Sequence, residues 1–305
     1  MSRFVTQRVL QGIGTIIVVS IVVFLSVQVS GNPAALLLPD EASPEDIARL
    51  EAELGLDRPL FIQYLLFMKD FWSSSGTLRS FIYVVPLLPL LLESLKWTLV
   101  LAVGATGVAL VLGLPLGALT ALKRGSAIDV VVRVLAAIGQ SLPSFWVAML
   151  MMLLFAVKLQ WFPVSGLGWK HAVLPLFTLA LYQVATLLRI FRSEMLEQLH
   201  QDYVRTARAK GIIERKVVMR HVVKNAALPV LTITGLQLNN LVLGAVVVEP
   251  IFAWPGLGNL MVRSVFARDY PVVVGGTILA AVLITAINVG VDILYCQLDP
   301  RIRVQ

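Results

Sequence analysis

The stretch DYVRTARAKGII at residues 202–213 places basic side chains and a glycine between two long apolar runs. Apolar residues recur at three- and four-residue spacing over residues 194–210, which predicts one helix with an apolar stripe. Gly211 is expected to end this helix, and a second short amphipathic helix is predicted over residues 214–224. The stripe comprises Leu196, Leu199, Tyr203 and Ala207; the basic flank comprises Arg205, Arg208 and Lys210; Ile212 and Ile213 project at the break. Such a basic helical pair either lies on anionic lipid or fills a groove on a protein, and the pattern alone favours neither.

A second group of residues able to bind a solute consists of polar side chains inside otherwise apolar runs. These residues are Gln140, Ser141, Ser144, Gln183, Gln237, Asn240 and Asn288. Neutral amides and hydroxyls can line a path for a polar solute, and they can equally join neighbouring helices by hydrogen bonds. The residue types leave both interpretations open.

Sequence patterns typical of ATP binding, metal binding and hydrolysis are absent. The dipeptide Gly-Lys of a phosphate-binding loop does not occur, and the histidines lack the spacing of metal ligands. No G-x-S-x-G pattern is present, and the ionisable residues near the apolar runs lie mainly at their ends, where pairing or snorkelling is the ordinary role. These residues are Glu93, Lys96, Arg133, Lys158, Glu249 and Asp292. We therefore predict that the chain is not an enzyme, has no metal site or cofactor of its own, holds no buried carboxylate for ion coupling, and draws its energy from another protein.

The elements that must position these residues follow from composition. Hydrophobic residues make up 58% of the 305 residues, charged residues make up 14%, and the mean hydropathy is +0.84. A soluble protein of this length would carry much more charge. The apolar residues also form continuous runs of about the ~20 residues that a helix needs to cross a bilayer. The chain is predicted to be an all-α membrane protein.

Six transmembrane helices are predicted. They lie near residues 9–30, 95–122, 134–157, 172–190, 228–248 and 272–294. The first run is too long for the apolar region of a secretory signal, so it is expected to stay as a span. In the second run, Gly113 and Gly117 form a G-x-x-x-G pair that favours close approach of another helix.

The distribution of charge predicts the orientation of these spans. With the N-terminus inside the cell, 16 of the 25 Lys and Arg residues face the cytoplasm, nine of them between Arg189 and Lys224. Cytoplasmic loops carry such an excess, so we predict that both termini are cytoplasmic. The basic pI of 9.8 then reflects loops that face anionic membrane lipid, and no nucleic acid is implied.

The predicted organisation has three parts: an N-terminal tail and first span at 1–30, an extracytoplasmic loop at 31–94, and a core at 95–305 that includes the cytoplasmic loop 191–225. In the extracytoplasmic loop, SPEDIARLEAELG predicts a short helix that Ser43 caps and Gly55 ends. Prolines and glycines in EPIFAWPGLGNL, after the fifth run, predict a turn or a re-entrant segment.

The cytoplasmic loop resembles the coupling loop, or EAA loop, of ATP-binding-cassette importer permeases, in the form found in the dipeptide and oligopeptide branch. Arg205, Thr206 and Ala207 stand where the general motif has Glu-Ala-Ala, and Gly211 stands at the motif glycine. Further matches follow in order: SGNPA at 30–34, LGLDRPL at 54–60, SLPSFWV at 141–147, FPVSG at 162–166, RHVVKNAALPV at 220–230, VVVEPIFAWPGLG at 246–258, RDYP at 268–271 and LDPRIR at 298–303. Two departures are Asn32, where aspartate is common, and ESLKWTLVL at the second span, where a proline-containing stretch is usual.

The resemblance implies a type I ABC importer permease fold in the bacterial cytoplasmic membrane. It implies as partners a second homologous permease, two cytoplasmic ATPases that bind the ATP and magnesium, and an extracytoplasmic solute-binding protein. The residues that would seat the loop on an ATPase are Tyr203, Arg205, Ala207, Arg208, Lys210 and Gly211. Di- or oligopeptides are the expected solutes, with nickel chelates, glutathione and other peptide-like molecules as alternatives. A self-contained secondary transporter or channel is the rival function.

Overall fold

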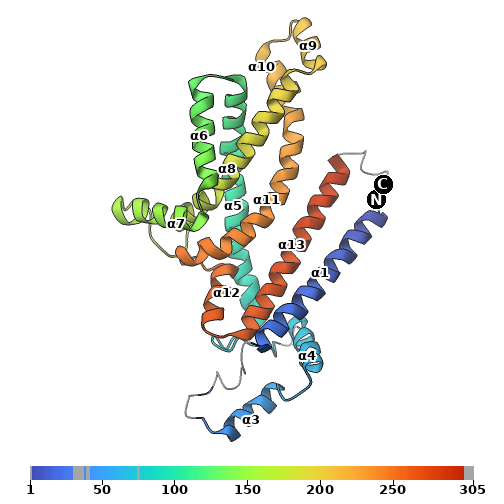
Figure 1. Cartoon of the computed structure of the whole chain (residues 1–305), viewed down its shortest axis with the longest axis vertical. Helices are drawn as coiled ribbons and strands as arrows, with labels where there is room; N and C mark the ends of the chain where they lie inside the picture. Colours follow the sequence, from blue (N-terminus) through green and yellow to red (C-terminus); the bar gives the residue numbers. More distant parts are fainter. Residues whose placement is uncertain (1, 30–37, 39–41, 74–75, 299–305) are drawn as a thin grey trace. The chain divides into compact units, whose positions relative to one another are not determined.

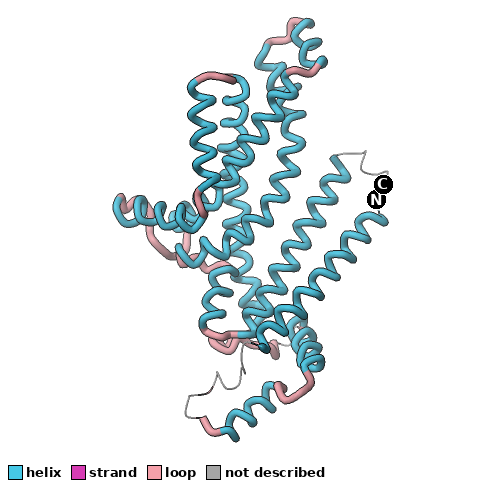
Figure 2. The backbone as a smooth tube through the Cα atoms, in the orientation of Figure 1, coloured by secondary structure: helices cyan, strands magenta, loops and turns pink. Residues whose placement is uncertain are grey.

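The computed structural model describes residues 2–29, 38, 42–73 and 76–298. Regular structure within these residues is helical, apart from an isolated bridge between Arg79 and Pro86 (Figure 2). The prediction of an all-α protein is confirmed. Long apolar runs fold as helices because each backbone N–H and C=O group is then paired within its own segment, as lipid requires. SGNPA at 30–34, with Asn32, and most of LDPRIR at 298–303 lie outside the described residues.

Within the described ranges, five helices are long and apolar enough to cross a membrane. They are α1 (Ser2–Val29), α5 (Leu87–Leu122), α8 (Trp169–Leu199), α11 (Val223–Ile251) and α13 (Tyr270–Leu298). Each contains one of the predicted apolar runs almost entirely, although α5 begins before residue 95 and α8 continues beyond residue 190.

The third predicted span is not a single helix. The helix α6 (Ala127–Ser141) is followed by α7 (Ser144–Met151) and the π-helical segment η1 (Met152–Lys158), and the two parts meet at 106° (Figure 1). Leu142 and Pro143 have extended backbones at the break. Proline lacks an N–H group and disfavours helical geometry in the preceding residue, which explains the bend. The chain has six spans if this bent pair counts as one.

Shorter helices connect the spans. They are α3 (Pro44–Leu54), α4 (Leu60–Trp72), α9 (Asp202–Ala209), α10 (Glu214–Val217), the π-helical η2 (Val218–Val222) and α12 (Leu257–Phe266). The predicted helix in SPEDIARLEAELG is confirmed as α3. Ser43 and Asp46 form a capping box at its start, and Gly55 ends it with φ 70°. The segment EPIFAWPGLGNL ends α11, turns and begins α12.

The chain divides into two compact units, and the first contains residues 98–254 together with the end of α13 from residue 290. In this unit α8 packs against α6, α7 and α11. The predicted close approach at the two glycines of α5 is confirmed: a Cβ atom on Gly113 would lie 3.2 Å from the Val184 carbonyl oxygen, and one on Gly117 would lie 2.8 Å from the Leu188 carbonyl oxygen. Only glycine leaves room for backbones at this separation.

The second unit contains residues 2–97 and 255–289. Aromatic and aliphatic side chains from α1, α4, α5, α12 and α13 form its core. Asp269, just before α13, is fully buried. Its carboxylate accepts hydrogen bonds from the Ser80 hydroxyl, from Phe81 N at 3.1 Å and from Ile82 N at 3.2 Å. The turn over residues 79–86 is thereby held against the start of α13.

Candidate functional site

The loop between α8 and α11 folds into a compact knob, residues 201–217, at the ends of these two helices (Figure 1). The expectation of one helix over residues 194–210 is wrong, because α8 ends at Leu199 and Gln201 has an extended backbone with φ −70° and ψ 150°. The second predicted helix, 214–224, does not end at Lys224 but continues through η2 into α11. The break after α8 redirects the chain, so that α9 can turn its apolar side back toward α8.

The inner side of the knob is part of the hydrophobic core of the first unit. Val204 and Ala207 of α9 and Val217 of α10 are buried in one cluster with Phe191 and Met195 of α8. Ile212 packs against the same cluster, so only one of the two predicted tip residues projects: Ile213 is 77% exposed. Ala207, predicted as a contact residue, faces this core. It can influence a partner only by setting the position of α9.

The outer side of the knob carries the polar residues predicted for partner binding. Tyr203 is 37% exposed, and its hydroxyl donates to Gln198 Oε1 at 2.6 Å and accepts from Asn225 Nδ2 at 3.1 Å. Arg205 is exposed and lies 3.5 Å from the Asp202 carboxylate. Lys210 and Gly211 are exposed at the turn. The result is a surface of one aromatic ring, basic groups and an aliphatic tip.

The turn of the knob is closed by an ion pair and by glycine geometry. Arg208 donates from Nη2 to Glu214 Oε1 at 2.7 Å and from Nε to Glu214 Oε2 at 3.0 Å. The hydrogen bond with Glu214 raises the pKa of Arg208 above its ordinary value, so the guanidinium stays charged. Gly211 has φ +73°, a region that side chains with a Cβ atom disfavour, and a Cβ atom built there would meet nothing within 4 Å. Glycine is therefore required by the backbone and not by lack of space.

A cavity of about 350 Å³ lies in the first unit between α6, α7, α8 and α11. Six of the seven polar residues predicted for a solute path line it: Gln140, Ser141, Ser144, Gln183, Gln237 and Asn240. Asn288 belongs to the second unit and is not among the lining residues. The break between α6 and α7 lies at the cavity, and Ser141 and Ser144 line the cavity from either side of this break.

Several of the polar side chains around the cavity have hydrogen-bond partners within the protein. Gln140 Nε2 donates to Thr186 Oγ1 at 2.7 Å, and Asn240 Nδ2 donates to Gln237 Oε1 at 2.6 Å. Gln183 differs: it is 1% exposed, and neither amide atom has a hydrogen-bond partner in the part of the chain that the structure describes. The lining residues are all uncharged. The Gln140–Thr186 bond joins α6 to α8, whereas the Gln237–Asn240 bond lies within α11. The same residues line the cavity, and their role in a solute path stays a prediction.

Two carboxylates near helix ends are buried, although the sequence predicted no buried carboxylate. Glu249 of α11 is fully buried and accepts a 2.6 Å hydrogen bond from Thr98 Oγ1. Asp129, at the start of α6, is buried and accepts two 3.0 Å hydrogen bonds from Arg192 of α8. Arg133 also pairs with Asp129, as expected for a span-end residue. Neither carboxylate lines the cavity, and each joins two helices.

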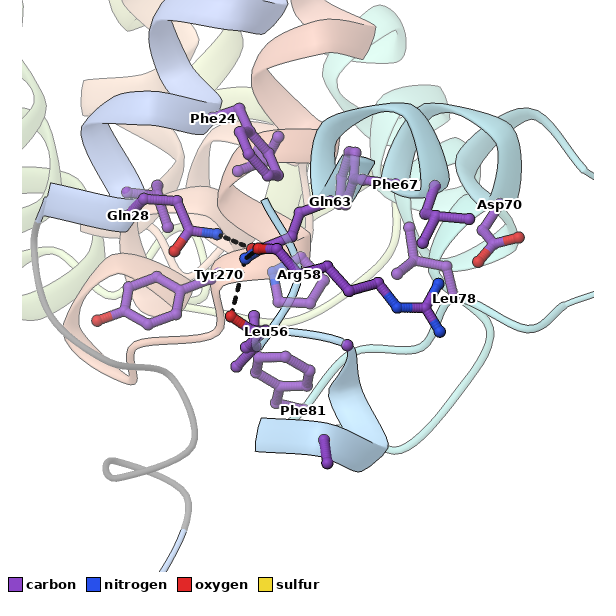
Figure 3. Close-up of a pocket in the computed structure, with 16 residues that line it drawn as sticks. Phe24, Gln28, Leu56, Arg58, Gln63, Phe67, Asp70, Leu78, Phe81 and Tyr270 are labelled. Carbon is purple, nitrogen blue, oxygen red and sulfur yellow. Dashed lines mark hydrogen bonds between the residues drawn. The ribbon is translucent and has the colours of Figure 1, made fainter. Parts of the chain in front are cut away.

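A second cavity, of about 310 Å³, lies within the second unit and has a structural explanation (Figure 3). Gln63 of α4 points into it and donates from Nε2 to the carbonyl oxygens of Leu56 and Arg58, at 2.9 Å and 2.8 Å. Gln28 of α1 donates to Gln63 Oε1 at 2.9 Å. These bonds satisfy the half-buried amide of Gln63 and hold the turn between α3 and α4, whereas the amide of Gln183 has no such partners.

The sequence did not predict three features of the site. Tyr182, beside Gln183 in the fourth predicted span, also lines the cavity, although its residue type alone gives no sign of this role. The Arg192–Asp129 pair joins residues that are far apart in the sequence, so no local pattern predicts it. The SLP sequence before Ser144 contains the signal for the bend, but the continuous apolar run around it obscured that signal.

Comparison with known proteins gives the family. The family model described as the binding-protein-dependent transport system inner membrane component matches residues 113–304, and its N-terminal companion model matches residues 1–80. A Brucella abortus (strain 2308) protein, named as a peptide transport system permease, is 42% identical over 314 residues, covering 99% of each chain. The oligopeptide transport system permease protein AppB of Bacillus subtilis (strain 168) is 36% identical, covering 99% of this chain and 100% of that protein.

The fold has a counterpart among solved structures. The chain is similar to a structure of the MetNI methionine ABC transporter in an inward-facing conformation, with a TM-score of 0.59 and 22% identity over 70% of this chain and 98% of that chain. This likeness concerns the arrangement of the helices. Together with the two family models and the relatives that match over nearly the full length, it leads to one conclusion: the chain belongs to the family of binding-protein-dependent transport system inner membrane components, multi-pass permeases of the bacterial inner membrane.

Proposed function

We propose that this chain is one of two permease subunits of an ATP-driven importer of di- or oligopeptides, and that it forms half of the solute path. The observation that carries the proposal is the continuity of the knob with the helices of the cavity. Val204 and Ala207 share a core with α8 and α11, and these two helices present Gln183 and Gln237 to the cavity. A displacement of the knob would therefore move two cavity walls with it.

The knob would dock in a groove on a cytoplasmic ATPase. Tyr203, Arg205, Arg208, Lys210 and Gly211 supply its exposed surface, and Ile213 supplies an apolar tip. An amphipathic helical element of this kind suits helix-in-groove binding. ATP and magnesium would be bound by the ATPases, so this chain needs no cofactor. The Arg208–Glu214 pair joins the two sides of the turn at Gly211.

Peptides are the proposed solutes because the relatives that match nearly the whole chain are named as peptide or oligopeptide permeases. A solute-binding protein would deliver the peptide on the outer side, and a second homologous permease would complete the path. The uncharged cavity lining is compatible with solutes of varied side chains, since no fixed charge selects among them.

The proposed orientation places both termini and the knob in the cytoplasm. It can be tested by single-cysteine labelling in a Cys296→Ser background. Lys210→Cys is expected to react with a membrane-impermeant maleimide only in inside-out vesicles, whereas Arg49→Cys is expected to react in intact spheroplasts. Labelling in the opposite pattern would refute the orientation.

The function itself is tested by purification and reconstitution. Mild-detergent purification from the host membrane is expected to recover a second permease and two chains with a phosphate-binding loop. The complex in proteoliposomes, with its binding protein and internal ATP, is expected to accumulate peptide. Peptide uptake by this chain alone, driven by an ion gradient, would instead support the self-contained secondary transporter.

A further inference from the structure

Gln183 combines burial, lack of partners and position in a way that no other polar residue of the cavity does. Its side chain is 1% exposed, and neither Nε2 nor Oε1 has a hydrogen-bond partner among the described residues. An unpaired amide in an apolar interior is costly, and such groups in native proteins are few. The position is therefore unfavourable unless another molecule or another conformation supplies both a donor and an acceptor.

The surroundings of Gln183 do not supply these partners. Gln140 is engaged with Thr186, and Gln237 is engaged with Asn240. Thr178, five residues earlier on α8, donates to the carbonyl oxygen of Leu174 at 2.8 Å. The cavity is the open space that Gln183 borders, so a solute in it can provide what the protein does not.

The chemistry of the site defines the group that would be recognised. A side-chain amide presents a donor and an acceptor side by side, and the N–H and C=O groups of one residue in an extended peptide present the complementary pair on one side of the chain. A carboxylate would satisfy only Nε2, and an ammonium group would satisfy only Oε1. The cavity volume of about 350 Å³ lies within the range of small-ligand sites.

We propose that Gln183 recognises the backbone of an extended peptide solute in transit, donating from Nε2 to the carbonyl oxygen of one solute residue and accepting at Oε1 from the N–H group of that same residue. This inference rests on the proposed function and deepens it. The cavity would read the backbone, which all peptides share, and would leave side-chain selection to the solute-binding protein.

The test uses two probes that differ in one group: trialanine, and its depsipeptide analogue in which an ester oxygen replaces the N–H of the central residue. Uptake is measured with the complete importer in proteoliposomes at saturating, pre-loaded binding protein, so that capture does not limit the rate. In Gln183→Leu, trialanine loses both proposed hydrogen bonds and the ester loses only the one to its carbonyl oxygen. The preference for trialanine over the ester is therefore expected to fall by about five- to tenfold, the value of one hydrogen bond. Gln11→Leu removes an exposed amide from α1, outside the cavity, and should leave both rates unchanged.

The outcomes separate the possibilities. Loss of discrimination between amide and ester in Gln183→Leu, with an unchanged melting temperature, supports the proposal. Equal effects on both probes would overturn it. Loss of assembly in both Gln183→Leu and Gln183→Met would also overturn it, because the amide would then be paired with a protein group in the complex. Absence of ATP-dependent peptide uptake by the wild type would refute the proposed function, and this inference with it.

Discussion

Glycine-to-alanine substitutions along α5 give a graded test of how closely this helix approaches α8. The structure provides three positions on one helix: Gly107, where an added Cβ atom meets no described atom within 4 Å outside its own helix; Gly113, where the nearest contacts are 3.2 Å; and Gly117, where the Leu188 carbonyl oxygen is 2.8 Å away. The substitution is chemically identical at all three positions. Differences between the variants therefore report helix packing.

The magnitudes follow from two opposing effects. Alanine is favoured over glycine in a helix interior by about 1 kcal/mol, so Gly107→Ala should be neutral or stabilising by up to about that amount. At Gly117 the backbone oxygen cannot rotate away, and overpacking costs about 1–3 kcal/mol. Gly117→Ala should therefore be destabilising by up to about 2 kcal/mol overall. Gly113→Ala should lie between the two.

The assay is thermal unfolding of the three purified variants in the same detergent, together with peptide uptake by the reconstituted importer. At about 2 °C per kcal/mol, Gly107→Ala and Gly117→Ala should differ by several degrees in Tm. Equal melting temperatures at the two positions, or a higher one for Gly117→Ala, would refute the close approach of α5 and α8.

Three further predictions concern the knob and the turn over residues 79–86. Gly211→Val should lower ATP-driven uptake at normal expression, because valine strains a backbone at φ +73°. Gly211→Asn should retain most uptake, because asparagine tolerates positive φ. Equal uptake by the two variants would contradict the argument that position 211 needs a residue able to adopt positive φ. Ile213→Ser should weaken co-purification of the ATPase without changing Tm, because the Ile213 side chain is 77% exposed. Ile212→Ser should instead lower Tm, because the Ile212 side chain packs on the core. The reverse pattern would show that Ile212, not Ile213, is the residue that contacts the partner. Asp269→Asn should lower Tm, because a neutral amide replaces a buried carboxylate that accepts three hydrogen bonds. The expected loss is about 1.5–3 kcal/mol for each charge-assisted hydrogen bond removed, and Ser80→Ala should lower Tm less. An unchanged Tm in Asp269→Asn would show that the buried carboxylate is not needed.

Local patterns predicted much of the helical structure. Composition and run length gave the membrane class and five of the spans, because lipid forces every apolar run of sufficient length to satisfy its backbone internally. The cap at Ser43 and the turn at Gly211 were also predictable, since each depends on the conformational preference of one residue and its near neighbours.

Tertiary packing decided what local patterns could not. The side of α9 that faces the hydrophobic core is set by the break after Leu199. This break allows Val204 and Ala207 to become buried against α8. The sequence supplied the polar residues from three apolar runs, but only the bend at Pro143 and the packing of α8 on α11 brought six of them around one cavity. Contacts between residues far apart in the chain depend on the whole fold, and no spacing along the sequence encodes them.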